Sequence, residues 1–339
     1  MKKNALLKEK IYGCLVGVAT GDAMGMPTAM MSPEKIRTIF KDYVEDFLPA
    51  PAGHSIHANM RAGQITDDTQ QTLVIADSIL AHHTIDPTDI ARRLITWCES
   101  VNAFDTLILG PSSSRSLLSI KHGKPIREAG IFGDTNGACM RISPVGIYAM
   151  GELERTVESV ALACLPTHNT NIAISGASAI AMAIGTALSG ESNVDSIIQR
   201  ALQAAEMGML KGNIWYGASI LKRTELALQI VTSHQNRTSI MNDLYNIIGA
   251  GVAITETVPL ALAVLKMTAG DPVDAIRIAV NLGGDCDTTA SIIGGMCGAI
   301  AGIRAFPDKW IEKIEEVNHL HLDQYAQKLY DLVTGQNSK

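Results

Sequence analysis

Apolar residues recur at the three- and four-residue spacing of amphipathic helices along most of this sequence. Ile11 and Leu15, for example, fall on one face of a helix that the spacing predicts over Lys8–Ala23. The two-residue alternation that marks half-buried strands is almost absent. The pattern therefore predicts an all-α protein with very little strand.

The predicted helices follow one another without a low-complexity linker, so we expect one all-helical domain over residues 1–339. After the first helix they are predicted over Pro33–Phe40, Thr66–His82, Pro87–Val101, Ser112–His122, Ala138–Met150, Thr156–Ala163, Asn171–Leu188, Val194–Lys211, Ile214–Val231, Leu244–Ile247, Thr257–Ala269, Pro272–Leu282, Ser291–Ala305 and Pro307–Val333. Irregular structure is predicted for Gly21–Pro27, Tyr43–Gly63 and Glu128–Asn136.

Composition argues against several classes of protein. The formal net charge is −6 and no basic run occurs, so we expect no nucleic-acid binding. Hydrophobic residues make up 47% of the chain and aromatic residues only 4%, a balance that favours closely stacked helices over a β-sandwich. The six cysteines form no CxxC pair, which is typical of core thiols in a reducing compartment.

Membrane insertion and secretion are not expected either. The most apolar stretches, Ile172–Leu188 and Ile292–Ile303, are rich in Gly, Ser and Ala and are predicted to be buried helices. The N-terminal residues carry positive charge but lack the apolar run of a signal peptide. We therefore expect a soluble cytoplasmic protein.

A first acidic cluster stands at the start of a predicted helix and consists of Thr66, Asp67, Asp68 and Thr69. Capping by Thr66 or Asp67, with the other acid complementing the helix dipole, explains this cluster about as well as a functional role does. The first cluster alone therefore leaves capping and function equally open.

A second acidic cluster lies more than 200 residues later, within residues 283–288. Two acids that are two residues apart point in different directions on a helix, but in an irregular turn Asp285 and Asp287 can aim at one cation. Gly283 and Gly284 supply the backbone freedom for such a turn, and Thr288 adds a hard oxygen. Capping is the weaker explanation here, because a cap needs fewer glycines and acids.

Together the two clusters offer four carboxylates and several hydroxyls. Hard oxygen ligands suit Mg²⁺, Mn²⁺ or Ca²⁺ and not zinc, which prefers His and Cys. Four carboxylates at one place repel one another unless one or two divalent cations neutralise them. The sequence therefore predicts that Asp67, Asp68, Asp285 and Asp287 converge on one metal site, in a chain that folds back on itself.

These motifs, in this order, resemble the ADP-ribosylglycohydrolase family, which includes the dinitrogenase reductase-activating glycohydrolase. The resemblance runs from about residue 8 to about residue 306 and rests on Gly21-Asp22-Ala23-Met24-Gly25-Met26-Pro27, Thr66-Asp67-Asp68-Thr69, Asn136-Gly137-Ala138-Cys139-Met140-Arg141, Thr167-His168 and Gly283-Gly284-Asp285-Cys286-Asp287-Thr288. The two acidic motifs are specific in combination, and the others are supportive.

The resemblance implies an orthogonal all-α fold with two Mg²⁺ or Mn²⁺ ions and hydrolysis of a glycosidic bond at the anomeric carbon of a ribose. It implies that the metal ligands are Thr66, Asp67, Asp68, Asp285, Asp287 and Thr288. The expected substrate contacts are Asp22, Gly133, Asn136, Gly137, Met140, Arg141, His168 and Gly284. The expected substrate is an ADP-ribosylated protein or a small ribosyl molecule.

One position departs from the family pattern. Many members carry a glutamate two residues after the proline of the first motif, where it is implicated in catalysis, and this chain has Ala29 there. Asp67 or Asp68 then becomes the expected catalytic acid, because a carboxylate at a metal's edge can also orient a water.

Two alternatives stay open at this point. The enzyme could hydrolyse a small nucleoside-like riboside, which the loss of the glutamate leaves possible. The chain could also be a catalytically silent relative that binds a nucleotide. The intact acidic clusters argue against the silent relative, because four unneutralised carboxylates bring such a protein no advantage.

Overall fold

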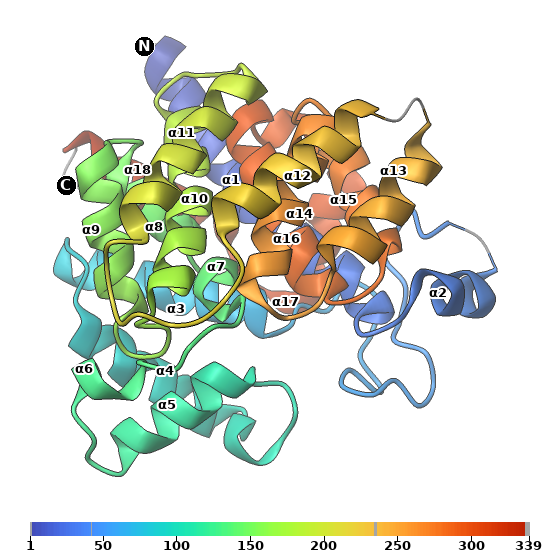
Figure 1. The fold of residues 1–339 in the computed structure, drawn as a ribbon. Coiled ribbons are helices and arrows are strands. Elements are labelled where there is room, and N and C mark those ends of the chain that lie inside the picture. Colours follow the sequence, from blue (N-terminus) through green and yellow to red (C-terminus); the bar gives the residue numbers. More distant parts are fainter. Residues whose placement is uncertain (1, 42, 234–235, 336–339) are drawn as a thin grey trace.

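Eighteen α-helices build the part of the chain that this computed structural model describes, residues 2–41, 43–233 and 236–335 (Figure 1). They are α1 (Lys2–Gly25), α2 (Pro33–Phe40), α3 (Asp67–His82), α4 (Pro87–Ser100), α5 (Pro111–Lys121), α6 (Ile126–Ala129), α7 (Gly137–Met140), α8 (Ser143–Ala149), α9 (Leu153–Cys164), α10 (Asn171–Leu188), α11 (Val194–Gly208), α12 (Ile220–Ser233), α13 (Arg237–Asp243), α14 (Ile254–Met267), α15 (Pro272–Leu282), α16 (Cys286–Ala301), α17 (Asp308–Asn318) and α18 (Leu322–Thr334). Short 3-10 helices lie at Met26–Thr28, Ala103–Asp105 and Ile303–Ala305, and a π-helix at Leu244–Ile248.

The all-α prediction is confirmed. Within those described ranges there is no strand, and three isolated β-bridges join Met31 to Gly284, Thr135 to Ala253 and Thr170 to Asn213. The predicted bounds of α2, α10 and α15 match the structure, because each begins at a side-chain cap that the sequence shows. All of α10 is buried, as predicted for an apolar core helix.

Helix α1 packs most extensively against α16, and four glycines of α1 make this approach possible. A Cβ placed on Gly13 would lie 2.7 Å from the Gly298 carbonyl oxygen, and one on Gly25 would lie 2.5 Å from that of Cys286. A Cβ on Gly17 would overlap the carbonyl of Gly294. The backbones of the two helices therefore touch. This contact fixes the start of α16, and with it the second acidic cluster, beside the end of α1.

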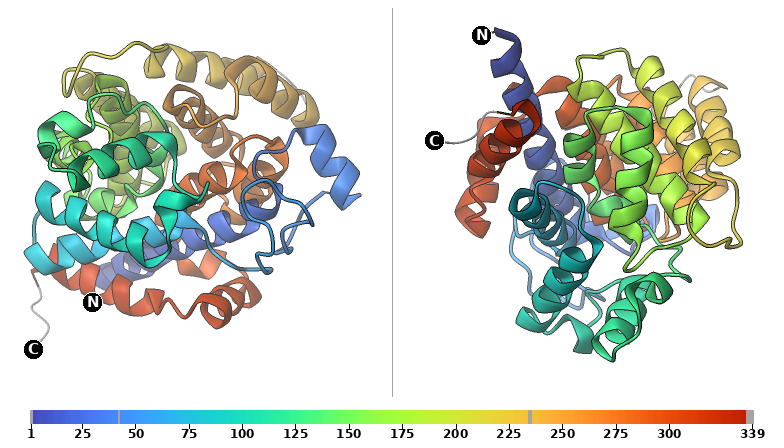
Figure 2. Two further views of the ribbon diagram at one scale, coloured as in Figure 1. Left: turned by 90° about the horizontal axis from the view of Figure 1, so that it is seen from below. Right: turned by 90° about the vertical axis from the view of Figure 1, so that its left-hand side faces the viewer.

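The predicted irregular segment Gly21–Pro27 was wrong, since α1 continues to Gly25 and a 3-10 helix follows. The glycines are used there for close packing and not for chain flexibility: a Cβ on Gly21 would overlap the carbonyl of Ala290. Helix α18 also packs along α1, so the first and last helices lie side by side (Figure 2).

Several predicted helices are shorter or broken in the structure. The helix predicted over Ala138–Met150 divides into α7 and α8, because Pro144 has no N–H to donate to the Met140 carbonyl four residues earlier. Residues 214–219 are not helical, and α12 begins at Ile220. The predicted final helix divides at His319, which adopts the left-handed conformation that ends α17.

The contact between α1 and α16 yields the first prediction. We expect Gly17→Ala to lower the free energy of unfolding by about 1–3 kcal/mol, because the added methyl group forces two backbones apart. Chemical denaturation followed by circular dichroism measures this change. Gly110→Ala is the matched control, since a Cβ there meets nothing within 4 Å. Equal stability of the two variants would contradict the proposed close packing.

Candidate active site

The two acidic clusters open onto one cleft of about 380 Å³. Its lining residues are Met30, Ile56, His57, Asp67, Asp68, residues 106–111, Ser113, Ser114, Thr135, Asn136, Gly137, Met140, Val252, Asp285, Asp287 and Thr288. The first cluster begins α3 and the second begins α16, so two helix starts more than 200 residues apart in sequence meet here. The four aspartates converge as the sequence predicted.

Asp22, inside α1, holds the start of α3. Its fully buried carboxylate accepts hydrogen bonds from the backbone N–H of Thr66 at 3.0 Å and of Thr69 at 3.1 Å. It also accepts the hydroxyls of Thr66 at 2.7 Å and Thr69 at 2.5 Å. Burial raises the pKa of Asp22 to about 6, against the opposing effect of the two threonines. Asp22 does not line the cleft, so it positions α3 and does not meet the substrate directly.

Asp68 is the most poorly satisfied acid of the site. Its Oδ1 atom is buried without a hydrogen-bond partner among the described residues. Its Oδ2 atom lies 3.2 Å from the Thr66 hydroxyl and 3.3 Å from the Thr288 hydroxyl. The Thr66 hydroxyl makes a shorter bond to Asp22, so its single proton points away from Asp68. Two electron-rich oxygens therefore face each other there.

Asp285 and Asp287 are each held by a side chain from a distant segment. Asn136 donates through Nδ2 to Asp285 Oδ2 at 2.5 Å, and the same nitrogen reaches the Thr257 hydroxyl at 3.1 Å. His57 Nε2 lies 2.8 Å from Asp287 Oδ2, and the histidine is only 4% exposed. These two contacts hold one oxygen of each carboxylate, and the Thr288 N–H donates to the other oxygen of Asp287 at 3.0 Å.

The sequence did not single out His57. It lies in the segment Tyr43–Gly63, which was predicted only to be irregular, and no periodicity distinguishes it from its neighbour His54. Burial lowers the pKa of His57, but the hydrogen bond and charge of Asp287 outweigh burial and raise it above its ordinary value. His57 therefore carries positive charge more readily than a free histidine and partly offsets the acidic cluster.

The pKa values of the other carboxylates reflect their burial and their closeness to one another. Burial first, and then the charges of the neighbouring aspartates, raise the pKa values of Asp67, Asp68 and Asp285 well above the ordinary value. Burial acts the same way on Asp287, but the hydrogen bond and charge of His57 hold its pKa below the ordinary value. A positive charge in the cleft would favour the ionised form of all four.

Arg141 and His168 lie behind the wall of the cleft and not on it. Arg141 is buried and donates to Gln71, whose amide in turn donates to Asp67 Oδ2 at 3.0 Å. Arg141 also donates to the Thr167 hydroxyl at 2.6 Å and approaches His168 Nδ1 at 3.2 Å. The guanidinium therefore supports Asp67 through Gln71, and no direct substrate contact is open to it in this arrangement.

His168 is fully buried and neutral. Burial, and then the charge of Arg141, lower its pKa well below the ordinary value. Because Nδ1 faces the Arg141 donor, Nε2 carries the proton and donates to the Thr135 hydroxyl at 3.0 Å. Thr135 does line the cleft, so His168 acts on the cleft through that hydroxyl.

The predicted substrate contacts therefore divide into two groups. Asn136, Gly137 and Met140 line the cleft, whereas Asp22, Gly133, Arg141, His168 and Gly284 do not. Gly133 packs against the backbone of Thr167 and His168, and Gly284 forms a β-bridge with Met31. Both glycines are needed for close backbone approach, which explains the motif without any substrate contact.

The turn expected around the second cluster is shorter than predicted. Asp285 precedes α16 and Asp287 lies in its first turn, so the two acids do not share an irregular loop. They reach one cleft because Asp285 is outside the helix, with φ −84° and ψ 68°, while Asp287 follows the helical path. The positive φ values of Gly283 and Gly284 bring the chain into this position.

The chemistry of these residues fits a hard divalent cation. The unpartnered Asp68 Oδ1, and the Oδ2 atom that faces the Thr66 oxygen, are groups that a cation satisfies directly. In the described residues no three His, Cys, Asp or Glu side chains stand close enough to hold an ion as they lie. A bound cation would therefore take threonine hydroxyl oxygens as well as carboxylates as its donors.

Comparisons with known proteins agree with this architecture. The model of the ADP-ribosylglycohydrolase family matches residues 3–339. An uncharacterized Escherichia coli (strain K12) protein, YegU, is 35% identical over 95% of this chain and 96% of its own. The ADP-ribosylhydrolase ARH3 of Bos taurus is 26% identical over 95% of this chain and 92% of its own. A structure titled ADP-ribosylglycohydrolase-related protein complex has the same fold, with a TM-score of 0.70 at 23% identity over 97% and 99% of the two chains.

Proposed function

Since this chain belongs to the ADP-ribosylglycohydrolase family, whose members hydrolyse ADP-ribose linkages, we propose that it cleaves a ribosyl glycosidic bond with the help of bound Mg²⁺ or Mn²⁺. The chain is a glycosidase-type hydrolase by family. The observation that carries the metal-dependent proposal is the buried Asp68 carboxylate, with one oxygen unpartnered and the other facing the Thr66 hydroxyl oxygen.

Six residues would hold the cations, namely Thr66, Asp67, Asp68, Asp285, Asp287 and Thr288. When bound, such ions supply a positive field that lowers the pKa of a coordinated water and binds the vicinal hydroxyls of a ribose. Asn136 and His57 keep Asp285 and Asp287 oriented before substrate arrives. Such prior orientation is what makes a polar site effective in catalysis.

The reaction breaks the bond between the ribose anomeric carbon and its nitrogen or oxygen substituent. A water molecule adds its oxygen to that carbon and keeps one hydrogen in the new hydroxyl group, while its other proton passes by way of a cleft carboxylate to the leaving group. Asp67 and Asp68 are the proposed catalytic acids. Asp67 is tied to Gln71 and only partly buried, so it can reach a substrate atom, whereas Asp68 orients the attacking water.

The proposed substrate is an ADP-ribosylated protein or an ADP-ribose derivative, as in the family. A small riboside is the second candidate, and Ala29 is the observation that favours it. Ala29 is buried, and the cleft wall at this point is formed by the apolar side chain of Met30. The cleft therefore lacks a carboxylate at that position and has an apolar surface there.

The experiment that tests this function has two readouts. Purified protein with Mg²⁺ or Mn²⁺ is incubated with ADP-ribosylated protein, with ADP-ribose derivatives and with small ribosides, and released ribosyl product is measured. We expect turnover of an ADP-ribosyl substrate that stops on chelation. Faster turnover of a small riboside would replace the first candidate with the second, and no turnover of any riboside would refute both.

Metal binding can be measured without turnover. We expect Mn²⁺ at a hundredfold excess over its Kd to add about 2.7 kcal/mol to the free energy of unfolding, because the ion binds only the folded chain. Asp287→Asn should abolish most of this gain. Asp77→Asn, on the same α3 as the first cluster but bonded to Tyr325, is the control that keeps it. An unchanged melting curve of the wild type on adding the ions would falsify the metal site.

A further inference from the structure

Part of the cleft lining is apolar and is attached to the second acidic cluster. The side chains of Met30 and Ile56 line the cleft there and form what we call the apolar wall. Met30 donates its backbone N–H to the Gly284 carbonyl oxygen at 2.6 Å. Ile56 directly precedes His57, whose ring contacts Asp287 at 2.8 Å. Both side chains therefore come from backbone that is tied to the start of α16.

Met30 is the exception in a buried stretch of chain. Thr28, Ala29 and Met31 are buried, whereas Met30 is 40% exposed and lines the cleft. Moving a large apolar side chain out of water is favourable. An apolar group bound in the cleft would therefore gain free energy by covering Met30.

The backbone at Met30 has a conformation that residues other than glycine disfavour. Its φ is 59°, in the left-handed region. Two hydrogen bonds hold it there, because the Met30 N–H donates to the Gly284 carbonyl at 2.6 Å and the Gly284 N–H donates to the Met31 carbonyl at 2.8 Å. Strained residues of this kind persist only where the surrounding structure fixes them, and they cluster at functional sites. The bend lets Met30 face the cleft while both of its chain neighbours stay buried.

The turn that carries Ile56 is fixed from within. Through Nδ1, the buried His54 ring accepts the backbone N–H groups of Ile56 at 3.2 Å and of His57 at 3.0 Å. The rings of His54 and His57 also lie against each other, with their centroids 5.2 Å apart. Because these contacts involve only the protein itself, the apolar wall is formed before a ligand arrives.

Other parts of the cleft suit the charged portion of an ADP-ribosyl group better. Ser113, Ser114 and Thr135 bring hydroxyl groups to the lining. Residues 106–111 add further apolar side chains, but among the described residues no hydrogen bond joins that segment to either acidic cluster. The apolar wall is thus the apolar surface that is tied to the acids proposed to hold the ribose.

A cationic leaving group finds no charged partner on the apolar wall. Both oxygens of the neighbouring Asp287 are already engaged, Oδ2 by His57 at 2.8 Å and Oδ1 by the Thr288 N–H at 3.0 Å. Guanidinium groups are recognised by carboxylates through paired hydrogen bonds, and the wall presents a thioether and alkyl groups instead. Methionine sulfur makes favourable contacts with aromatic rings. The wall therefore favours an uncharged ring.

We propose that the apolar wall is the leaving-group subsite of the cleft, and that Met30 and Ile56 select an uncharged aromatic leaving group over a guanidinium. This inference rests on the proposed hydrolytic function. On cleavage, the oxygen of water bonds to the anomeric carbon. The bond to the leaving nitrogen or oxygen breaks with its electron pair passing to that atom, which takes the proton that the water gives up. Met30 and Ile56 touch only the ring, so they determine specificity and take no part in proton transfer.

A comparison of two substrates tests the selection. They are p-nitrophenyl ADP-riboside, with an aromatic leaving group, and ADP-ribosylagmatine, with a guanidinium, in the same anomeric configuration. We expect Met30→Ala to lower kcat/KM for the nitrophenyl substrate at least about tenfold more than for the agmatine substrate, because the lost apolar contact acts only on the ring. Met30→Leu keeps an apolar side chain and should keep the wild-type ratio. The intrinsic reactivity of each substrate cancels in this comparison.

Oxidation of Met30 measures the contact without turnover. Hydrogen peroxide converts exposed methionine to its sulfoxide, and mass spectrometry gives the rate at each methionine. We expect a carbon-linked phenyl analogue of ADP-ribose, which has no glycosidic bond to hydrolyse, to slow oxidation of Met30 in the wild type with Mg²⁺. ADP-ribose, which lacks the ring, should slow it less.

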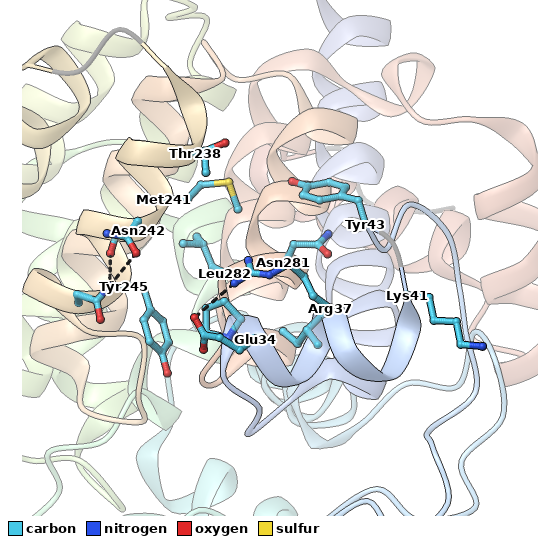
Figure 3. A pocket seen from close by; sticks show the side chains of 13 residues that line it. Glu34, Arg37, Lys41, Tyr43, Thr238, Met241, Asn242, Tyr245, Asn281 and Leu282 are labelled. Carbon is cyan, nitrogen blue, oxygen red and sulfur yellow. Dashed lines mark hydrogen bonds and ion pairs between the residues drawn. The ribbon is translucent and has the colours of Figure 1, made fainter.

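Met241 is the internal control for oxidation. It lies on α13 in the wall of another cavity, of about 610 Å³, between α2, α13 and the end of α15 (Figure 3). Among the described residues, this cavity and the acidic cleft share no lining residue. Oxidation of Met241 should therefore be unchanged by either ligand. Equal slowing at Met241 and Met30 would report a general tightening of the fold and would overturn the subsite.

The two measurements separate failure of the subsite from failure of hydrolysis. Turnover with equal losses on both substrates in Met30→Ala overturns the subsite and leaves hydrolysis standing. A wild type that prefers ADP-ribosylagmatine also overturns it, since nitrophenolate is intrinsically the better leaving group. No turnover of either substrate, with Met30 protected by the phenyl analogue, overturns hydrolysis and supports the contact. Met30 left unprotected in the wild type overturns the contact even if Met30→Ala fails to fold, which circular dichroism shows.

Discussion

Asp68→Asn is expected to remove most hydrolysis of ADP-ribosyl substrates, with turnover falling by a factor on the order of 10²–10³ or more. Asp68 is buried, its Oδ1 has no partner among the described residues, and its Oδ2 faces the Thr66 hydroxyl oxygen. The substitution replaces an ionisable ligand with a neutral amide that binds divalent ions weakly. Product release by the wild type and the variant, at the same Mg²⁺ concentration, measures the effect.

The same substitution should have the opposite effect on stability without metal. Burial and the neighbouring aspartates disfavour the charge on Asp68, so removing that charge relieves repulsion in the metal-free protein. We expect the melting temperature of Asp68→Asn, measured with a chelator, to equal or exceed that of the wild type. Asp77→Asn is the control and should retain activity, since its carboxylate binds Tyr325. Loss of activity together with a large loss of stability would mean that Asp68 is a structural residue.

Stability of the metal-free protein is expected to rise as the pH falls from 7 to 5. Burial raises the pKa of Asp22 from an ordinary 3.8 to about 6. Protonation of Asp22 therefore stabilises the fold, fully so below pH 3.8. This stabilisation is lost as the pH rises through about 6. The full difference is roughly 3 kcal/mol for a shift of about two units in a fully buried group. The raised pKa values of Asp68 and His57 act in the same direction.

Denaturation with urea at pH 5, 6 and 7 in the presence of a chelator measures this dependence. The effect of Asp287 on stability has the opposite dependence on pH, because its pKa is lowered and its charged form stabilises the fold. That stabilisation is lost only as the pH falls below the ordinary carboxyl range. Saturating Mn²⁺ should flatten the profile, because the ion favours the ionised carboxylates. Greater stability at pH 7 than at pH 5 without metal is the result that contradicts this account of the cluster.

A Cβ on Gly284 would overlap the carbonyl of Ala250, so the close approach of these segments requires a glycine there. Its positive φ and the absence of a side chain let three segments meet at the entrance to α16.

The sequence by itself determined the helical class and most helix starts. Caps such as Ser32, Thr170 and Asp271 are local signals, because each side chain bonds a backbone N–H three residues ahead. The acidic motifs also predicted a site of hard oxygen ligands, since the residue types alone decide which ions such ligands suit. These properties depend on neighbours in the chain, so a linear pattern carries them.

Only the tertiary structure decided which residues stand on the cleft wall and which stand behind it. Asp22 and Arg141 belong to motifs, yet one caps α3 and the other supports Asp67 through Gln71. His57 belongs to no motif, yet it holds Asp287. The physical reason is that α1 and α16 touch backbone to backbone, which sets the positions of segments hundreds of residues apart. Local spacing carries no information about that contact or about the direction in which a side chain on either helix points.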